Sequence, residues 1–167
     1  RMLRAVGAAV RTAPGRVEVR PAERLRPLRL TVPGDFSSAA PFVVAATLLP
    51  GSRLRISGIG VNPTRTGLLD VLERMGARIA VFNRRRAGRE AVGDVHIENA
   101  ELVGVEVRAD EVPRLVDELP LVALLASHAR GKSIVRGAKE LRVKESDRID
   151  AVADGLRACG ARIRARE

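Results

Sequence analysis

The run of charged residues between positions 142 and 148 contains the side chains best suited to chemistry. Lys144 and Arg148 are cations, and the carboxylate of Glu145 lies between them in the sequence. The segment from Leu141 to Val143 alternates in polarity and is expected to be extended, whereas apolar residues spaced three and four apart from Ile149 onward predict a helix. A helix start already carries partial positive charge, so two cations there favour the binding of an external anion.

Charge pattern alone leaves a second interpretation open for this run. Residues three apart on a helix lie on the same side, so Glu145 and Arg148 can form an ordinary solvent-exposed ion pair. Such a pair needs no ligand. The anion-binding hypothesis therefore depends on what else lies near the run.

A second candidate is Asp117, which with Glu118 precedes an apolar helix expected from Leu119 to Ala129. Acids in a first turn ordinarily complement the helix dipole, and that interpretation stays open. The alternative is a general base at a helix start that faces a cleft. Asp117 and Lys144 occupy comparable positions before two successive helices. If helix starts converge on one side of a repeated unit, Asp117 and the charged run would form one site.

Composition narrows the class of protein. Hydrophobic residues make up 46% of the 167 residues, which argues against disorder and allows a real core. Aromatic residues are only 2%, so the chain is poorly equipped to stack nucleic-acid bases. The net charge of +10 still favours anionic partners, namely nucleic acid, a membrane surface or phosphorylated metabolites. A compositional preference for Arg accounts for part of this charge.

The metal-ligating and nucleophilic residue types are sparse. Cys159 is the only cysteine, which excludes an internal disulfide and indicates a reducing compartment. It lies near the end of the last expected helix, after Leu156, where we expect a small core residue and not a nucleophile. His96 and His128 lack the spacing of metal ligands, so no metal is predicted. Apolar runs are too short to span a membrane.

An internal repeat organises the chain. Similar helix ends, each closing with Gly-Ala, occur at residues 3–8, 72–77 and 156–161, and similar strand-type segments occur at 51–58 and 131–137. Each of these helix ends, the last one at 156–161 included, is followed by a short segment of strand type. The unit is helix, strand, helix, strand, strand. Because the chain begins inside one repeat and stops inside another, we expect it to be part of something longer.

Local signals predict the remaining elements. Val32 to Asp35 is the expected linker, with Asp35 capping a helix that reaches Leu48. Asn62 is expected to cap another helix, with proline at its first position. Residues 83–93 are expected to form an exposed hairpin loop. Strands are expected at 16–19 and 28–31.

The string Arg-Val-Lys-Glu-Ser-Asp-Arg at 142–148 resembles the signature of the EPSP synthase family of enolpyruvyl transferases. Three further stretches resemble the same family in order and at fitting spacing. They lie at residues 33–39, 62–67 and 117–120. The resemblance therefore runs through essentially the whole chain.

The resemblance implies an α/β fold of repeated βαβαββ units, arranged as an inside-out α/β barrel, or α-β prism. Members of the family have two such domains, and the chain crosses between them twice. Residues 1–31 would belong to the tail of one domain, and residues 32–167 would form most of two units of the other. The active site would lie between the domains.

The resemblance also implies an activity. The family transfers the enolpyruvyl group of phosphoenolpyruvate to the 5-hydroxyl of shikimate 3-phosphate and releases phosphate, with no metal or organic cofactor. By residue match, Asp117 and Lys144 would contact shikimate 3-phosphate, with Asp117 as proton acceptor. Glu145 would transfer protons at the phosphoenolpyruvate methylene, and Arg148 would bind phosphoenolpyruvate. A cytoplasmic monomer that binds neither nucleic acid nor membrane is implied.

Several of the family's other phosphate-binding segments have no counterpart in this sequence. We therefore expect the chain alone to have no meaningful turnover. Two alternatives stay open. A sister enzyme transfers the same group to UDP-N-acetylglucosamine, but it typically relies on a reactive cysteine in a mobile loop, whereas Cys159 is expected in a helix. Net charge alone would also fit a basic nucleic-acid-binding module.

Overall fold

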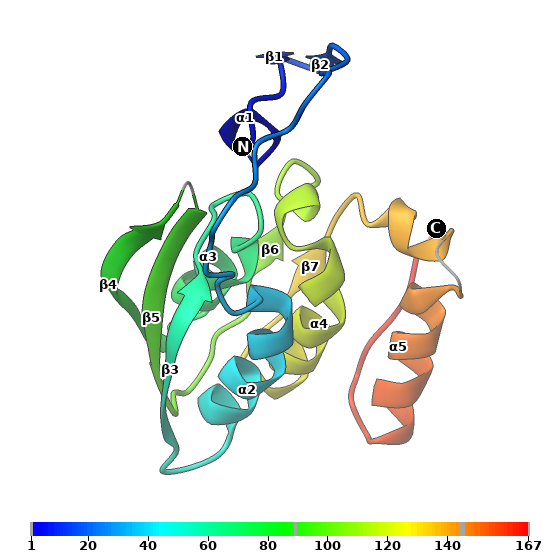
Figure 1. Ribbon diagram of the computed structural model, residues 1–167. Coiled ribbons are helices and arrows are strands. Elements are labelled where there is room, and N and C mark those ends of the chain that lie inside the picture. Colours follow the sequence, from blue (N-terminus) through cyan, green and yellow to red (C-terminus); the bar gives the residue numbers. More distant parts are fainter. Residues whose placement is uncertain (1, 89, 144–145, 167) are drawn as a thin grey trace.

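The fold is mixed helix and sheet in a computed structural model that describes residues 2–88, 90–143 and 146–166 (Figure 1). The first part of the chain projects from the rest and contains helix α1 (Met2–Ala5) and an antiparallel hairpin of β1 (Val10–Ala13) and β2 (Arg16–Val19). The strand expected at 16–19 is confirmed. The strand expected at 28–31 is wrong, because these exposed residues pair with no neighbouring strand in the described chain.

The expected linker leads directly into a capped helix. Gly34 forms a parallel bridge with Ile59, in which Gly34 N–H donates to Gly58 O at 3.0 Å. Helix α2 (Phe36–Leu48) follows, and Asp35 caps it as predicted by accepting a hydrogen bond from Ser38 N–H at 2.8 Å. The backbone bond and the Ser38 hydroxyl both stabilise the charged carboxylate and lower the pKa of Asp35.

A three-stranded antiparallel sheet has the order β3 (Arg53–Gly60), β5 (Glu90–Glu98), β4 (Arg78–Ala87). Helix α3 (Gly67–Arg74) connects β3 to β4. The hairpin loop expected at 83–93 is wrong, because β4 continues to Ala87 and β5 begins at Glu90. Alternation is broken there by an irregular register between Phe82 and Arg85, which the sequence pattern does not reveal.

The buried carboxylate of Asp94 holds the two irregularities of this sheet together. It accepts hydrogen bonds from Arg55 Nη2 at 2.8 Å, Gly58 N–H at 2.9 Å and Asn83 Nδ2 at 3.0 Å. Asn83 has a positive φ of 49°, and the register of β3 shifts next to Gly58. The Arg55 hydrogen bond, followed by those from Asn83 and Gly58, holds the pKa of Asp94 far below its ordinary value.

The second unit is built of shorter elements. They are β6 (Glu106–Val107), the 3-10 helices η1 (Val112–Arg114) and η2 (Val116–Glu118), α4 (Leu119–His128), β7 (Ile134–Val135), η3 (Lys139–Arg142) and α5 (Arg148–Ala158). Strands β6 and β7 pair in parallel. The expected helix from Leu119 is therefore confirmed, and the expected strand at 131–137 is reduced to two residues.

Three expectations for the last part of the chain are wrong. The segment expected to be extended at 141–143 lies at a 3-10 helix, which ends at Arg142. Residues 161–166, expected to be strand-like, have no regular structure. Cys159 is exposed at the C-cap of α5 and is not a core residue.

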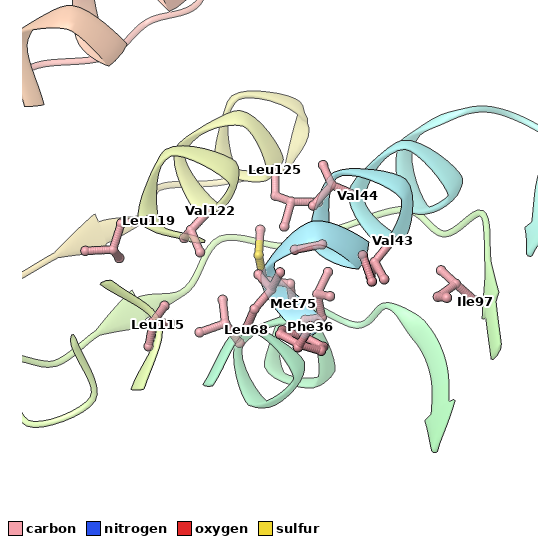
Figure 2. Packing of buried hydrophobic residues seen from close by; sticks show 14 of the residues in the cluster. Phe36, Val43, Val44, Leu68, Met75, Ile97, Leu115, Leu119, Val122 and Leu125 are labelled. Carbon is pink, nitrogen blue, oxygen red and sulfur yellow. The ribbon is translucent and has the colours of Figure 1, made fainter. Parts of the chain in front are cut away.

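The core lies where α2, α3 and α4 meet the sheet (Figure 2). Met75 lies centrally among aliphatic side chains from all three helices, as Figure 2 shows. The largest fully buried side chains are Leu68, Leu72, Met75, Ile97, Leu115 and Leu125. Aliphatic residues thus supply most of the packing, as the low aromatic content predicts.

Candidate functional site

Helices α2, α4 and α5 lie side by side and start toward the same end of the fold (Figure 1). Helix α4 packs against both of the others. Their starts carry polar residues at 35–38, 117–118 and 147–148, which are far apart in the sequence. Because each start carries a partial positive charge, this end of the fold is suited to bind anions. The predicted convergence of helix starts is confirmed.

Asp117 and Arg148 are brought together at this end. Asp117 Oδ1 lies 3.8 Å from Arg148 Nη1, and both side chains remain partly exposed. Asp117 sits at the second position of η2, directly before α4, and Arg148 is the first residue of α5. Two of the four predicted site residues are therefore neighbours. Lys144 and Glu145, the other two, lie outside the described residues.

Helix α5 begins at Arg148 because Asp147 caps it. Asp147 Oδ1 accepts hydrogen bonds from Ile149 N–H at 3.0 Å and Asp150 N–H at 3.1 Å. Arg142 Nη1 donates to Asp147 Oδ2 at 2.8 Å. The Asp150 N–H, together with Arg142, lowers the pKa of Asp147. Sequence reasoning missed this cap, although an aspartate directly before an apolar-periodic segment is a recognisable signal.

A buried carboxylate links the starts of α2 and α4. Glu118 is 4% exposed, and its Oε1 accepts a hydrogen bond from Ser37 Oγ at 2.5 Å. Arg65 Nη2 in turn donates to Ser37 Oγ at 3.1 Å. Sequence reasoning treated Ser37 as part of a helix cap and Glu118 as a first-turn acid. No local signal connects residues 81 positions apart, so only the fold reveals the link.

Arg65 is presented by a turn that precedes α3. Asn62 Oδ1 accepts a hydrogen bond from Thr64 N–H at 3.2 Å, and Asn62 O accepts one from the Thr66 hydroxyl at 3.2 Å. The predicted cap at Asn62 is wrong, because α3 begins at Gly67 with Thr66 in the N-cap position. The Asn-Pro dipeptide forms a turn here, and this turn places Arg65 opposite Ser37.

Asp117, Glu118 and Arg65 line one shallow pocket that opens to solvent. Its other walls are Thr64 and residues 113–116. Arg114 also lines it but is already engaged, since its Nη2 donates to Asp70 Oδ2 at 2.7 Å and its Nε donates to Pro63 O at 2.8 Å. The pocket thus combines an exposed carboxylate with cations and helix starts.

Close packing fixes the position of the segment that carries Asp117. Gly67 is buried, and a Cβ added to it would lie 2.8 Å from Leu115 Cδ2 and 3.0 Å from Arg114 O. The start of α3 therefore contacts the backbone two to three residues before Asp117. Any larger residue would push η1 and η2 away from this position.

The arrangement can support proton transfer on an anionic substrate. Within residues 2–88, 90–143 and 146–166, no group of His, Cys, Asp or Glu is placed to hold a metal ion. Over the same residues, each helix is too short or too polar to cross a bilayer. A carboxylate beside a guanidinium at a helix start can accept a proton while the cation holds a phosphate or carboxylate.

Comparisons with known proteins show the family to which the chain is similar. The sequence model of the family described as EPSP synthase (3-phosphoshikimate 1-carboxyvinyltransferase) matches residues 1–167. Proteins named 3-phosphoshikimate 1-carboxyvinyltransferase from Desulforamulus reducens and Citrifermentans bemidjiense are 48% and 50% identical over 163 residues. These matches cover 98% of this chain and 38% of each relative. The chain thus spans well under half the length of these curated relatives.

Solved structures give the same result. EPSP synthase from Acinetobacter baumannii superposes with a TM-score of 0.86 and 42% identity, over 93% of this chain and 35% of that one. The enolpyruvyl transferase NikO from Streptomyces tendae superposes with a TM-score of 0.60 and 28% identity, over 80% and 31% of the two chains.

The fold is therefore that of the enolpyruvyl transferases, which confirms the predicted α/β class. Within this class, the chain belongs to the EPSP synthase family. The comparisons favour this family over the UDP-N-acetylglucosamine enolpyruvyl transferase and the nucleic-acid-binding module.

Proposed function

We propose that this chain forms part of an enzyme that transfers the enolpyruvyl group of phosphoenolpyruvate to the 5-hydroxyl of shikimate 3-phosphate. The observation that carries the proposal is the placement of Asp117 beside Arg148 where helix starts converge. Membership of the EPSP synthase family supplies the reaction and the two substrates. The product feeds aromatic amino acid biosynthesis through chorismate.

In the proposed reaction, the 5-hydroxyl oxygen bonds to C2 of phosphoenolpyruvate while Asp117 accepts the hydroxyl proton. Glu145 delivers a proton to the methylene carbon, which becomes a methyl group in a tetrahedral adduct. The C2–O bond to phosphate then breaks, phosphate leaves, and the methyl group returns a proton as the new enol double bond forms. Arg148 binds phosphoenolpyruvate, and Lys144 binds shikimate 3-phosphate. No cofactor takes part.

The electrostatics of the site suit this reaction. Both substrates are anions, so holding them in contact costs repulsion that nearby cations offset. Arg148 lies 3.8 Å from Asp117, so a cation and a carboxylate face the same space. A carboxylate in this position can accept a proton while the cation holds an anionic group. The starts of α4 and α5 add partial positive charge toward the same space.

The decisive test replaces Asp117 in a full-length synthase that carries this sequence. Asp117→Asn keeps the shape and removes the base, so kcat should fall by about 10²–10⁴-fold. Asp154→Asn is the matched control, since this acid lies on α5, is 70% exposed and pairs with Arg157. Its activity should match the parent enzyme. Near-normal turnover by Asp117→Asn would overturn the proposal, and Glu145→Gln provides an independent second test.

We also propose that residues 1–31 and 32–167 belong to two different domains. Helix α1 and strands β1 and β2 contain no buried residue, which supports the division. The 167-residue chain by itself should release no phosphate from the two substrates. Its coverage of only 38% of the curated relatives supports this expectation. Steady phosphate release by the purified chain would contradict it.

The remaining parts of the proposal concern the cell and the assembly. We place the enzyme in the cytoplasm as a monomer that binds no nucleic acid, on the basis of the family resemblance and the single cysteine. Sedimentation of the full-length enzyme should give a single monomeric species. Competition with unrelated DNA at low salt should leave its activity unchanged.

A further inference from the structure

Arg65 lines the pocket but has no role in the proposed reaction. Its side chain is 57% exposed and lines the same pocket as Asp117. Its contacts within the described chain are Ser37 Oγ at 3.1 Å and Asp35 Oδ1 at 3.8 Å. A guanidinium has five N–H donors, so these two contacts leave several donors to offer to another partner.

The other two arginines of this region are differently engaged. Arg114 donates to Asp70 and to a backbone carbonyl, and this ties it to the wall of the pocket. Arg148 lies beside Asp117. Arg65 is instead held by a neutral hydroxyl and by a carboxylate that is 53% exposed. Its positive charge is thus less compensated than that of Arg114.

The buried carboxylate of Glu118 determines how Arg65 is held. A serine hydroxyl has one proton, and Ser37 donates that proton to Glu118 Oε1. The lone pairs of Ser37 Oγ are therefore left to accept from Arg65 Nη2. Because Glu118 is 4% exposed, its hydrogen bond to Ser37 is shielded from water and restricts the hydroxyl to one orientation. Glu118 and Ser37 together hold Arg65 over the pocket.

We propose that Arg65 binds the phosphate or carboxylate group of one anionic substrate beside Asp117, and that Ser37 and Glu118 are positioning residues for it. The proposal rests on the proposed function for its substrates and adds three residues to the site. A guanidinium that lines a pocket and has donors to spare suits bidentate binding of either group. Shikimate 3-phosphate and phosphoenolpyruvate both carry a phosphate and a carboxylate, so the experiment must distinguish the two.

The test is steady-state kinetics of Arg65→Gln in the full-length synthase, with each substrate varied separately. Loss of a charge-assisted contact should raise the KM of one substrate by about tenfold or more, with kcat within about threefold of the parent. The substrate whose KM rises is the one that Arg65 binds. Arg65→Lys keeps the charge but not the planar fork, so it should recover part of the affinity.

Arg53→Gln is the matched control. Arg53 is an exposed arginine on β3 that pairs with Glu98 and is remote from the pocket lining, so its removal changes net charge equally. Both KM values should stay unchanged in this variant. Equal KM values for Arg65→Gln and the parent, with a folded circular dichroism spectrum, would overturn the proposal. If Arg65→Gln does not fold, Arg65→Lys with unchanged KM for both substrates would overturn it equally.

Coupling between Ser37 and Arg65 tests the positioning role. Ser37→Ala should raise the same KM by a few fold, and adding it to Arg65→Gln should cause no further increase. Additive effects would mean that Ser37 acts on KM independently of Arg65 and would overturn the positioning role. Failure of the further inference is distinguishable from failure of the proposed function. Loss of activity in Asp117→Asn with an unaffected Arg65→Gln rejects only the role of Arg65.

Discussion

Helices α2 and α5 start in the same way and lie in different surroundings. Asp35 and Asp147 each cap a helix by accepting from backbone N–H groups in its first turn. Helix α2 then buries seven of its residues against the sheet and α4, whereas α5 buries only Ala153. The same local signal thus begins a helix in the core and a helix at the edge. Local sequence determines where a helix begins, and packing determines how much it stabilises the fold.

This difference matters for the site because each helix contributes to it. Helix α2, which buries seven residues, supplies the partly buried Ser37, and the largely exposed α5 supplies Arg148. Ser37 is thus tied to the core through its helix more firmly than Arg148 is. Substitutions at comparable positions in the two regions should therefore differ in their effects.

The largest loss of thermal stability should come from replacing Asp94, in the sheet beneath α2. Asp94→Asn removes a charge that Arg55, Asn83 and Gly58 all bind, so the thermal midpoint should fall by on the order of 10 °C at neutral pH. Asp154→Asn on α5 should leave the midpoint unchanged. A fall in Asp94→Asn no larger than that of the control would contradict the comparison.

The Asp94 carboxylate should also make the stability of the folded protein sensitive to acid. The folded state lowers the pKa of Asp94 below its ordinary value of 3.8, so its contribution is complete well above pH 3.8 and is lost as pH falls through and below that value. The lowered pKa values of Asp35 and Asp147 act in the same direction. Thermal scans should therefore show the parent losing stability on acidification more steeply than Asp94→Asn does.

The next largest loss of stability should come from truncating a buried valine. Val43→Ala on α2 removes two methyl groups from a fully buried site and should lower the free energy of unfolding by about 2–3 kcal/mol. Val152 on α5 is only half-buried, so Val152→Ala should cost less than about 1 kcal/mol. Urea unfolding measures both. Equal costs would mean that α5 is packed as tightly as α2.

Replacing either of two glycines with alanine should change the free energy of unfolding, with opposite signs at the two positions. Gly67→Ala forces a methyl group against Leu115 and the Arg114 carbonyl and should destabilise the protein by about 1–2 kcal/mol. Gly155 lies within α5 with no atom within 4 Å of an added Cβ, so Gly155→Ala should stabilise α5 by about 0.5–1 kcal/mol. The measurement is again urea unfolding, and a stabilising Gly67→Ala would contradict the close packing described above.

The smallest effects should come from the two caps. Asp35→Ala should lower the global free energy of unfolding by about 1 kcal/mol, because α2 unfolds only with the core. Asp147→Ala should instead speed amide hydrogen exchange within α5 and leave the global unfolding midpoint nearly unchanged. Exchange rates resolved by residue distinguish local from global opening. Uniform acceleration over both helices in either variant would contradict the distinction.

The same contrast explains which elements could be predicted from the sequence. The apolar runs that follow Asp35 and Glu118 predicted α2 and α4 to within two residues, because both helices bury a broad face. The two-residue strands β6 and β7 and the 3-10 helices have no period long enough to detect. Strand β4 continues through three arginines because Asp94, on the neighbouring strand β5, accepts a hydrogen bond from Asn83 at the irregular register. Nothing in the local sequence of β4 indicates this contact.

Some contacts of the candidate site could be predicted from the sequence and others could not. The internal repeat predicted that Asp117 and Arg148 would meet, since both lie at helix starts of similar units. The contact of Ser37 with Glu118 could not be predicted, because each residue has an adequate local role at its own helix start. Arg65 was missed because Asn62 resembled a helix cap, and the turn it forms becomes apparent only once α3 is placed.

The parallel pairing of β6 with β7 has a consequence for the order of folding. The two strands are separated by the whole of α4, so their hydrogen bonds cannot form until a long intervening segment has folded back. Strands β4 and β5 are consecutive in the chain and pair antiparallel, so they can form a hairpin within microseconds. We therefore expect the first unit to reach its native pairing early, and the second unit, which supplies Asp117, to be the slower step.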